Sequence, residues 1–145
     1  MSVPTATLPA LCLRLRATAQ SAAILRTALK AWLDENGVSA GEIFDLVVAC
    51  AEPLTIAIEG PSRPVALIVE VAGKIEGEML TVAVRDYGLC RLEPQEPEET
   101  LGMSLMAALV DTVSVQTHRD GRTFTLSHRL RGQRGRDGFV SSRPA

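Results

Sequence analysis

The chain has 145 residues, which is enough for one domain with one sizeable core but too few for two. Hydrophobic residues make up 46% of it and charged residues 22%, a balance that is typical of globular proteins and argues against general disorder. An uncharged apolar run such as Leu46 to Ala51 is far shorter than the roughly 20 residues that cross a bilayer, and no secretion leader opens the chain. We therefore expect a cytoplasmic protein without a membrane segment.

Charge and cysteine content exclude further classes. The formal net charge of −2 hides an asymmetry, because residues 131–145 contain four Arg and one Asp and leave −5 on residues 1–130. An acidic body disfavours direct binding of nucleic acid, which calls for a basic surface over the fold itself. The three cysteines lack CxxC spacing and clustered histidines, so neither a disulfide framework nor a zinc site is indicated. We expect one domain over residues 1–130 and a flexible basic tail over 131–145.

The first half of the chain predicts one strand and two helices. Leucines at 11, 13 and 15 alternate with more polar residues, which indicates a strand with one buried face. Apolar residues then recur at helical spacing from Ile24 to Leu33, and Asn36-Gly37 supplies a stop signal. Ser39 and Glu42 form a capping-box pattern ahead of a second helix. Its predicted apolar face holds Ile43, Phe44, Val47, Val48 and Ala51, and the helix runs towards Glu59 despite Pro53.

The second half predicts a hairpin, a long loop, a third helix and a final hairpin. Residues 65–72 and 79–85 read as strands joined near Glu76-Gly77, and residues 86–100 read as a solvated loop. Helical spacing returns from Met103 to Val110, and two alternating segments then flank the turn at Asp120-Gly121. Polar residues oppose the apolar ones on the strands, so one face of the sheet is exposed to solvent. The pattern predicts an α/β two-layer sandwich of order β-α-α-β-β-loop-α-β-β, with three helices on one face.

Three local segments surround the predicted loop, namely AEPLTIAIEG on the second helix, VRDYGLC after a strand, and LGMSL at a helix start. In this order, and with Gly121-Arg122-Thr123 ahead of the last strand, they resemble the ATP-binding boxes of the Bergerat-fold (GHKL, histidine-kinase-like ATPase) superfamily. The likeness is greatest to the small anti-sigma factor serine/threonine kinases and covers roughly residues 10 to 130. The resemblance implies a Bergerat-like mixed sheet and an ATP site at the boxes.

The first box departs from the family at its metal ligand. The family has a Glu that orients or activates the attacking hydroxyl, followed four residues later by an Asn that holds Mg²⁺ against the phosphates. Glu52 matches the Glu and is the candidate catalytic residue, whereas the Asn position is Ile56. A branched hydrocarbon offers no oxygen to a hard cation. We therefore expect no metal ligand here and no bound Mg²⁺, and the plain alternative for Glu52 is a solvated helix residue.

The other boxes are partly retained. In the family pattern D-x-G-x-G the Asp accepts the adenine amino hydrogen, and here Asp86 and Gly88 are kept while the last glycine is Cys90. The alternative for Asp86 is ordinary turn chemistry. The pattern G-x-G-L, which offers backbone amides to phosphates, keeps its first and last residues. The resemblance thus implies a cofactor-binding set of Asp86, Gly88, Gly102, Ser104, Leu105 and Thr123.

These departures favour a protein-binding switch over an enzyme. The first hypothesis is an anti-sigma-factor-like regulator that binds a sigma factor or an anti-sigma antagonist protein, with a degenerate site at which ATP binds weakly or not at all. The second is an active serine/threonine protein kinase that uses ATP to phosphorylate the antagonist, through Glu52 as base and Asp86 as adenine anchor. A phosphorelay or dimerisation module that binds no nucleotide ranks third. The resemblance also implies a possible homodimer.

Overall fold

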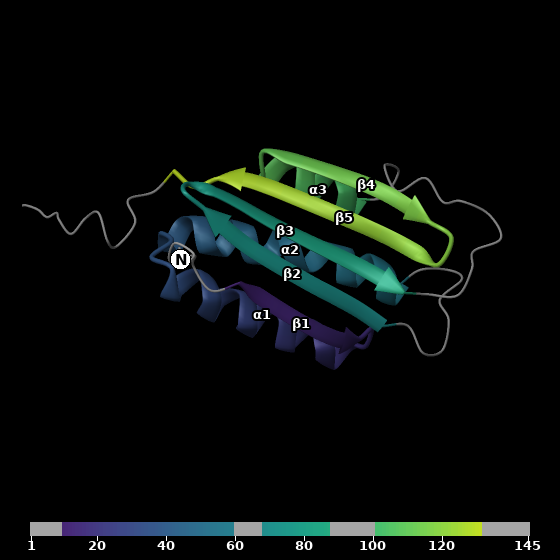
Figure 1. Cartoon of the computed structure of the whole chain (residues 1–145). Coiled ribbons are helices and arrows are strands. Elements are labelled where there is room, and N and C mark those ends of the chain that lie inside the picture. The colour runs from purple at the N-terminus through teal and green to yellow at the C-terminus, as the bar shows by residue number, and fades with distance from the viewer. Residues whose placement is uncertain (1–9, 60–67, 88–100, 132–145) are drawn as a thin grey trace, which may run out of the picture.

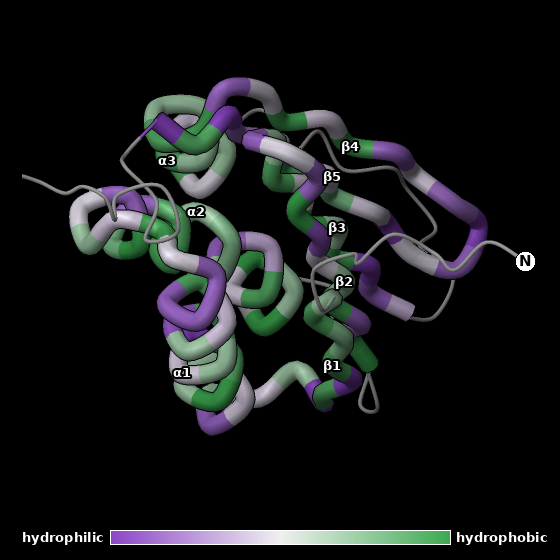
Figure 2. The backbone as a smooth tube through the Cα atoms, turned by 60° about the vertical axis from the view of Figure 1, so that its left-hand side comes forward, coloured by the Kyte–Doolittle hydropathy of each residue, from purple (hydrophilic) through white to green (hydrophobic). Residues whose placement is uncertain are grey.

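The computed structural model describes residues 10–59, 68–87 and 101–131. Five strands of these residues form one sheet of order β1-β2-β3-β5-β4, and three helices lie against one face of it (Figures 1 and 2). The elements are β1 (Leu11–Arg16), α1 (Ala19–Glu35), α2 (Ala40–Glu59), β2 (Ile68–Glu76), β3 (Met79–Tyr87), α3 (Leu101–Leu109), β4 (Thr112–His118) and β5 (Gly121–Arg129). The predicted two-layer sandwich and the predicted order of elements are confirmed.

The sheet is antiparallel throughout, so the expectation of a mixed sheet is wrong. All four neighbouring pairs, β1 with β2, β2 with β3, β3 with β5 and β4 with β5, are antiparallel. The reason lies in the last hairpin. Because β3 and β4 are both antiparallel to β5, they run parallel to each other, as a crossover through α3 requires, but β5 lies between them. The parallel strands β3 and β4 are therefore never paired directly.

Local signals set both ends of α1. Thr18 is its N-cap, and the Thr18 hydroxyl accepts a hydrogen bond from the Ser21 backbone N–H at 3.2 Å. At the other end Asn36 is the C-cap and Gly37 has a φ of 76°, a left-handed angle that glycine adopts without strain. The predicted stop at Asn36-Gly37 is confirmed. The core face of the helix is formed by Leu25, Leu29, Trp32 and Leu33, while Ile24 is 52% exposed.

Helix α2 begins after Ser39, whose hydroxyl oxygen lies 3.4 Å from the Glu42 backbone N–H and donates to the Glu42 carboxylate at 3.0 Å. Pro53 is accommodated inside the helix. The predicted apolar face is partly wrong, because Phe44 is 71% exposed. The buried face is rotated towards Ile43, Leu46, Ala49, Cys50, Leu54 and Ala57, which pack over the sheet. Burial raises the pKa of the Cys50 thiol to about 12, so this cysteine stays protonated.

The core fills the space between helices and sheet with aliphatic side chains. From the strands come Val69, Val71, Leu80, Val82, Phe124 and Leu126, each at most 1% exposed. Asp86 and Tyr87 belong to β3, so the predicted loop begins later than residue 86. Residues 88–100 lie outside the described part of the chain. The hairpin turns near Gly77 and Asp120-Gly121 are confirmed.

A cluster of polar groups ties the end of β5 to the start of α2. The Arg131 backbone N–H donates to Glu42 Oε2 at 2.7 Å, and its guanidinium donates to Asp111 Oδ1 at 2.7 Å. Between the two carboxylates lies His128, whose side chain is 8% exposed and whose Nε2 is 3.4 Å from Glu42. Arg131 was predicted to open the flexible tail, but it is held in this cluster. Residues 132–145 lie outside the described residues.

Asp111 gives this cluster a pH dependence. Hydrogen bonds from the Arg129 backbone N–H and from the Arg131 guanidinium hold the pKa of its carboxyl below the usual value. A carboxyl group whose pKa is lower in the folded state stabilises the fold. This stabilisation is fully present above the unfolded-state pKa and is lost as the pH falls through the folded-state pKa. Asp111→Asn is therefore expected to lower the urea midpoint near neutral pH, with the difference from wild type shrinking in acid. Asp34→Asn on α1 is the matched control, and a difference that stays constant into acid would contradict this prediction.

Candidate functional site

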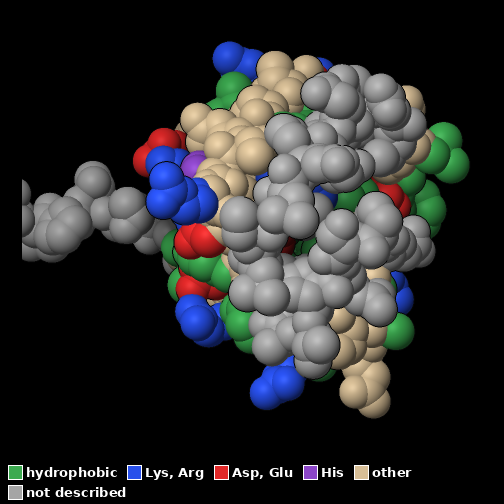
Figure 3. Space-filling view, turned by 90° about the vertical axis from the view of Figure 1, so that its right-hand side faces the viewer, with side chains coloured by type: hydrophobic (Ala, Val, Ile, Leu, Met, Phe, Trp, Pro, Cys, Tyr) green, Lys and Arg blue, Asp and Glu red, His purple; other side chains and the backbone are tan. Residues whose placement is uncertain are grey.

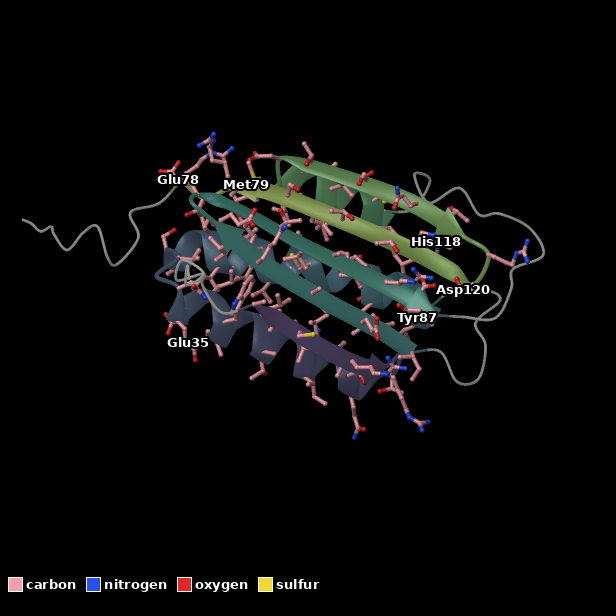
Figure 4. All side chains as sticks on the ribbon, viewed as in Figure 1. Glu35, Glu78, Met79, Tyr87, His118 and Asp120 are labelled. Carbon is pink, nitrogen blue, oxygen red and sulfur yellow. The ribbon has the colours of Figure 1, made fainter. Side chains whose placement is uncertain are left out.

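The segments singled out in the sequence meet at one end of the molecule. Strand β3 ends there, the β4–β5 turn lies beside it, and α3 begins there (Figure 1). In Figure 4 the labelled Tyr87, His118 and Asp120 mark this end, whereas Glu35, Glu78 and Met79 lie at the opposite end. Figure 3 views the same end directly, with both acidic and basic described side chains around its rim. The fold thus brings α2, α3, β3 and β5 together where an ATP site was expected.

Helices α2 and α3 touch closely at Gly102. A Cβ placed on Gly102 would lie 2.7 Å from Glu52 Oε1 and 3.2 Å from Ile56 Cδ1. Glu52 and Ile56, one helical turn apart on α2, therefore both face the first turn of α3. Gly102 is buried, and a side chain there would have to displace the Glu52 carboxylate. The predicted first and third boxes do meet in space.

This contact predicts the effect of a substitution. Gly102→Ala should cost a net 1–2 kcal/mol, roughly, because overpacking against Glu52 and Ile56 outweighs the better helix propensity of alanine. Chemical denaturation measures the loss. Gly102→Ala/Ile56→Ala should lose less than the two single changes added together, since the smaller side chain makes room. Strict additivity of the two single changes would mean that the α2–α3 contact is looser than described.

Asp86 is buried at the end of β3, with 3% of its surface exposed. Its Oδ1 accepts a hydrogen bond from the Arg122 backbone N–H at 3.0 Å. Gly121 adjoins it so closely that a Cβ would lie 1.8 Å from the Asp86 carbonyl oxygen. Asp86 is thus a strand residue fixed by β5 and not part of a plain turn. A fixed, buried carboxylate can recognise a single donor with strong directionality.

The remaining predicted residues differ in how they are placed. Thr123 is half-buried, and its hydroxyl lies 2.9 Å from Nε2 of His118 across the last hairpin. Ser104 is exposed on α3, and Leu105 is half-buried. Gly88 and Cys90 lie outside the described residues. His118 contacts Thr123 because the hairpin register brings the two residues to neighbouring positions.

Arg122 is a buried residue that the sequence did not single out as functional. It is 4% exposed, and its guanidinium carbon lies 5.5 Å from the centre of the Phe124 ring. Two residues apart on one strand, Arg122 and Phe124 share a face, so the alternation of β5 could have indicated the contact. Buried Arg is uncommon and marks this end of β5 as chemically distinct from the rest of the core.

A polar network on the solvent-exposed face of the sheet borders the site. The Tyr87 hydroxyl donates to Glu70 Oε1 at 2.9 Å, and this hydrogen bond raises the pKa of the Tyr87 phenol. Arg14 binds the other oxygen of Glu70. Arg85 lies with its guanidinium carbon 4.4 Å from the Tyr87 ring centre and donates to Asp120 at 2.9 Å. These exposed pairs link β1, β2, β3 and the β4–β5 turn.

The residues present fit a nucleotide base better than a metal ion. Among the described residues no three His, Cys, Asp or Glu side chains gather as a metal site, and the first box presents the hydrocarbon of Ile56 towards Gly102. Asp86 by contrast is in place as a hydrogen-bond acceptor. Two cavities lined by described residues lie elsewhere, one of about 600 Å³ between α1 and α2 and one of about 590 Å³ beside His128. No helix of the described residues is long and apolar enough to span a membrane.

Comparisons with known proteins agree with this geometry. The family model described as "Histidine kinase-like ATPase domain" matches residues 15–128. Among solved structures, the RsbU and RsbW domains of Rv1364c from Mycobacterium tuberculosis match with a TM-score of 0.68 and 30% identity over 87% of this chain. This chain spans 34% of that one, about a third of its length. A comparison with curated proteins finds no significant match.

The family match extends over most of the chain and includes every strand and helix except part of β1 and the end of β5. The chain belongs to the histidine kinase-like ATPase domain family. The resemblance to the Bergerat-fold superfamily and its anti-sigma factor kinases is confirmed by the family match together with the RsbW-containing neighbour.

Proposed function

We propose that this protein is an anti-sigma-factor-like regulator that binds a sigma factor or its antagonist protein and whose nucleotide site has lost its metal. The observation that carries the proposal is the side chain of Ile56 at the α2–α3 contact, 3.2 Å from where a Cβ of Gly102 would lie. In the family that this position resembles, an amide oxygen holds Mg²⁺. An aliphatic side chain cannot replace it, because Mg²⁺ demands oxygen ligands.

The pattern of retention supports binding over catalysis. The residue that would anchor a base is kept, and its placement supports binding, since Asp86 is buried and held by the Arg122 backbone N–H at 3.0 Å. Three other positions of the boxes have changed, namely Ile56 at the metal ligand, Cys90 in the adenine box and Ser104 in the phosphate box. Phosphoryl transfer depends on metal neutralising the charge of the phosphates, whereas protein binding needs only the shape of the fold.

The second candidate is an active serine/threonine kinase acting on the antagonist. One observation favours it, namely that Glu52 is kept and its carboxylate faces the first turn of α3 at Gly102. A carboxylate there could accept the proton of an attacking hydroxyl. This function needs another oxygen ligand for Mg²⁺. Glu59, one turn beyond Ile56 by sequence, is a candidate whose side chain lies outside the described residues.

Two measurements on purified proteins test the proposal. Gel filtration of the chain mixed with each candidate sigma factor or antagonist should yield a stable complex without nucleotide. Incubation with radiolabelled ATP and the antagonist should transfer no label above that of a Glu52→Gln control. If the chain binds none of the candidates, the proposal of a regulator is contradicted. If label is transferred and Glu52→Gln abolishes the transfer, the protein is the kinase instead.

A further inference from the structure

A groove between α1 and α2 lies away from the nucleotide site and has no part in the proposed function. Its volume is about 600 Å³, which falls within the roughly 300–1,000 Å³ of ordinary small-molecule sites. It is lined by the first half of α2, whereas Glu52 and Ile56 belong to the second half of this helix. The groove is therefore a separate feature of the molecule, and its lining indicates what it could bind.

The floor of the groove is apolar. On α2 the lining residues recur at helical spacing and form one stripe that rises about 12 Å along the helix axis. They are Ala40, Ile43, Phe44, Val47 and Val48. Val38, in the connection between the helices, also lines the groove, so this connection bounds one end of it. Phe44 is 71% exposed, and a ligand that covers its ring would remove apolar surface from water.

The α1 wall of the groove carries two cations one helical turn apart. Arg26 and Lys30 are exposed, and among the described residues neither of them forms an ion pair. Other basic side chains do have carboxylate partners, namely Arg14, Lys74, Arg85, Arg129 and Arg131. Long basic side chains lie with their methylene stems along apolar surface and keep their charge in water. The groove thus has a positive rim above an apolar floor.

Asp34 gives the groove a direction. Helices α1 and α2 run in opposite directions from their connection, so Asp34 lies at the bounded end and Arg26 lies at the other end (Figure 1). The Asp34 carboxylate repels an anion at the bounded end, whereas Arg26 and Lys30 attract one further along α1. An anionic head group therefore fits between the two cations, with its apolar body extending towards Val38.

These features together select a small anionic amphiphile. The apolar floor suits an alkyl body, and a carboxylate head would accept charge-assisted hydrogen bonds from Arg26 and Lys30. A helix of a partner protein would have to continue past the bounded end at Val38, whereas an alkyl chain can end there. We propose that this groove binds a free fatty carboxylate, with its head group between Arg26 and Lys30 and its alkyl chain along α2.

A calorimetric titration with decanoate, below its micelle concentration, tests the proposal against decan-1-ol, which has the same alkyl body without the charge. Decanoate should bind at one site per chain and about tenfold more tightly than decan-1-ol. Arg26→Gln/Lys30→Gln should bind the two ligands about equally, with an unchanged melting temperature because both positions are exposed. Arg16→Gln/Arg119→Gln removes the same charge at exposed positions outside the groove and should bind as wild type does.

Nuclear magnetic resonance locates the ligand, because decanoate should shift the methyl signals of Val47 and leave those of Val113 on β4 unchanged. Absence of decanoate binding, equal affinity for decan-1-ol, or a preference that survives Arg26→Gln/Lys30→Gln would overturn the proposal. Displacement of decanoate by ATP would overturn it too, since the ligand would then occupy the nucleotide site. If the groove binds an acidic helical peptide or anionic phospholipid vesicles but not free decanoate, its occupant is a protein or a membrane instead.

Discussion

Gly121→Ala is expected to destabilise the fold by about 3–5 kcal/mol, from backbone strain and overpacking combined. Gly121 has a φ of 147°, which side chains rarely tolerate, and a Cβ there would lie 1.8 Å from the Asp86 carbonyl oxygen. The obstacle is backbone on the neighbouring strand and cannot move aside by changing rotamer. Relief requires β5 to shift from β3, which also breaks the hydrogen bond from Arg122 to Asp86.

Urea denaturation followed by circular dichroism measures this loss, with Gly77→Ala as the matched control. Gly77 also has a left-handed φ, 63°, but nothing lies within 4 Å of a Cβ placed on it. Its substitution should cost only about 1 kcal/mol, from backbone strain alone. Equal losses at the two glycines would mean that β5 does not approach Asp86 as closely as described. If Gly121→Ala stays folded, the contacts around Asp86 should be altered, and the variant should bind nucleotide more weakly than wild type does.

Ile56→Asn is expected to introduce a dependence of ATP affinity on Mg²⁺. The substitution supplies an amide oxygen on the helix face that meets Gly102, one turn from Glu52. We expect Mg²⁺ to tighten ATP binding to the variant by about tenfold or more, equivalent to about 1.4 kcal/mol. In wild type the same addition of Mg²⁺ should change the affinity little. Titration calorimetry with ATP, in Mg²⁺ or in EDTA, measures both proteins.

Ile56→Val is the control for this gain. It keeps a branched hydrocarbon at the position and slightly reduces its volume, so it should behave as wild type does towards Mg²⁺. If Ile56→Asn folds normally but its ATP affinity is indifferent to Mg²⁺, the absence of a metal ligand at position 56 is not what limits the site.

The elements could be predicted from the sequence because their signals are local. Alternation in Leu11–Arg16 and the stops at Asn36-Gly37 and Asp120-Gly121 depend on neighbours in the chain, and the structure has these elements at these positions. The faces of the helices were less predictable. Phe44 fits an apolar stripe by spacing, yet it is 71% exposed, because which stripe meets the sheet depends on how α1 and α2 pack together.

The site was predictable as a set of residues but not as a set of contacts. Family resemblance singled out Glu52, Asp86 and Gly102, yet nothing in the sequence shows that a Cβ at Gly102 would strike the Glu52 carboxylate. That contact joins residues 50 positions apart on two helices. The burial of Arg122 has a local signal, because Arg122 shares the face of β5 that carries Phe124, but a charged residue directly after a turn is more often exposed.

The most direct test of the central idea, that Ile56 leaves the nucleotide site without its metal ligand, is a calorimetric titration of the wild-type protein with ATP in the presence of Mg²⁺ and again in EDTA. We predict that ATP binds weakly or undetectably, and equally so in both conditions. Tight binding that appears with Mg²⁺ and vanishes in EDTA would contradict it.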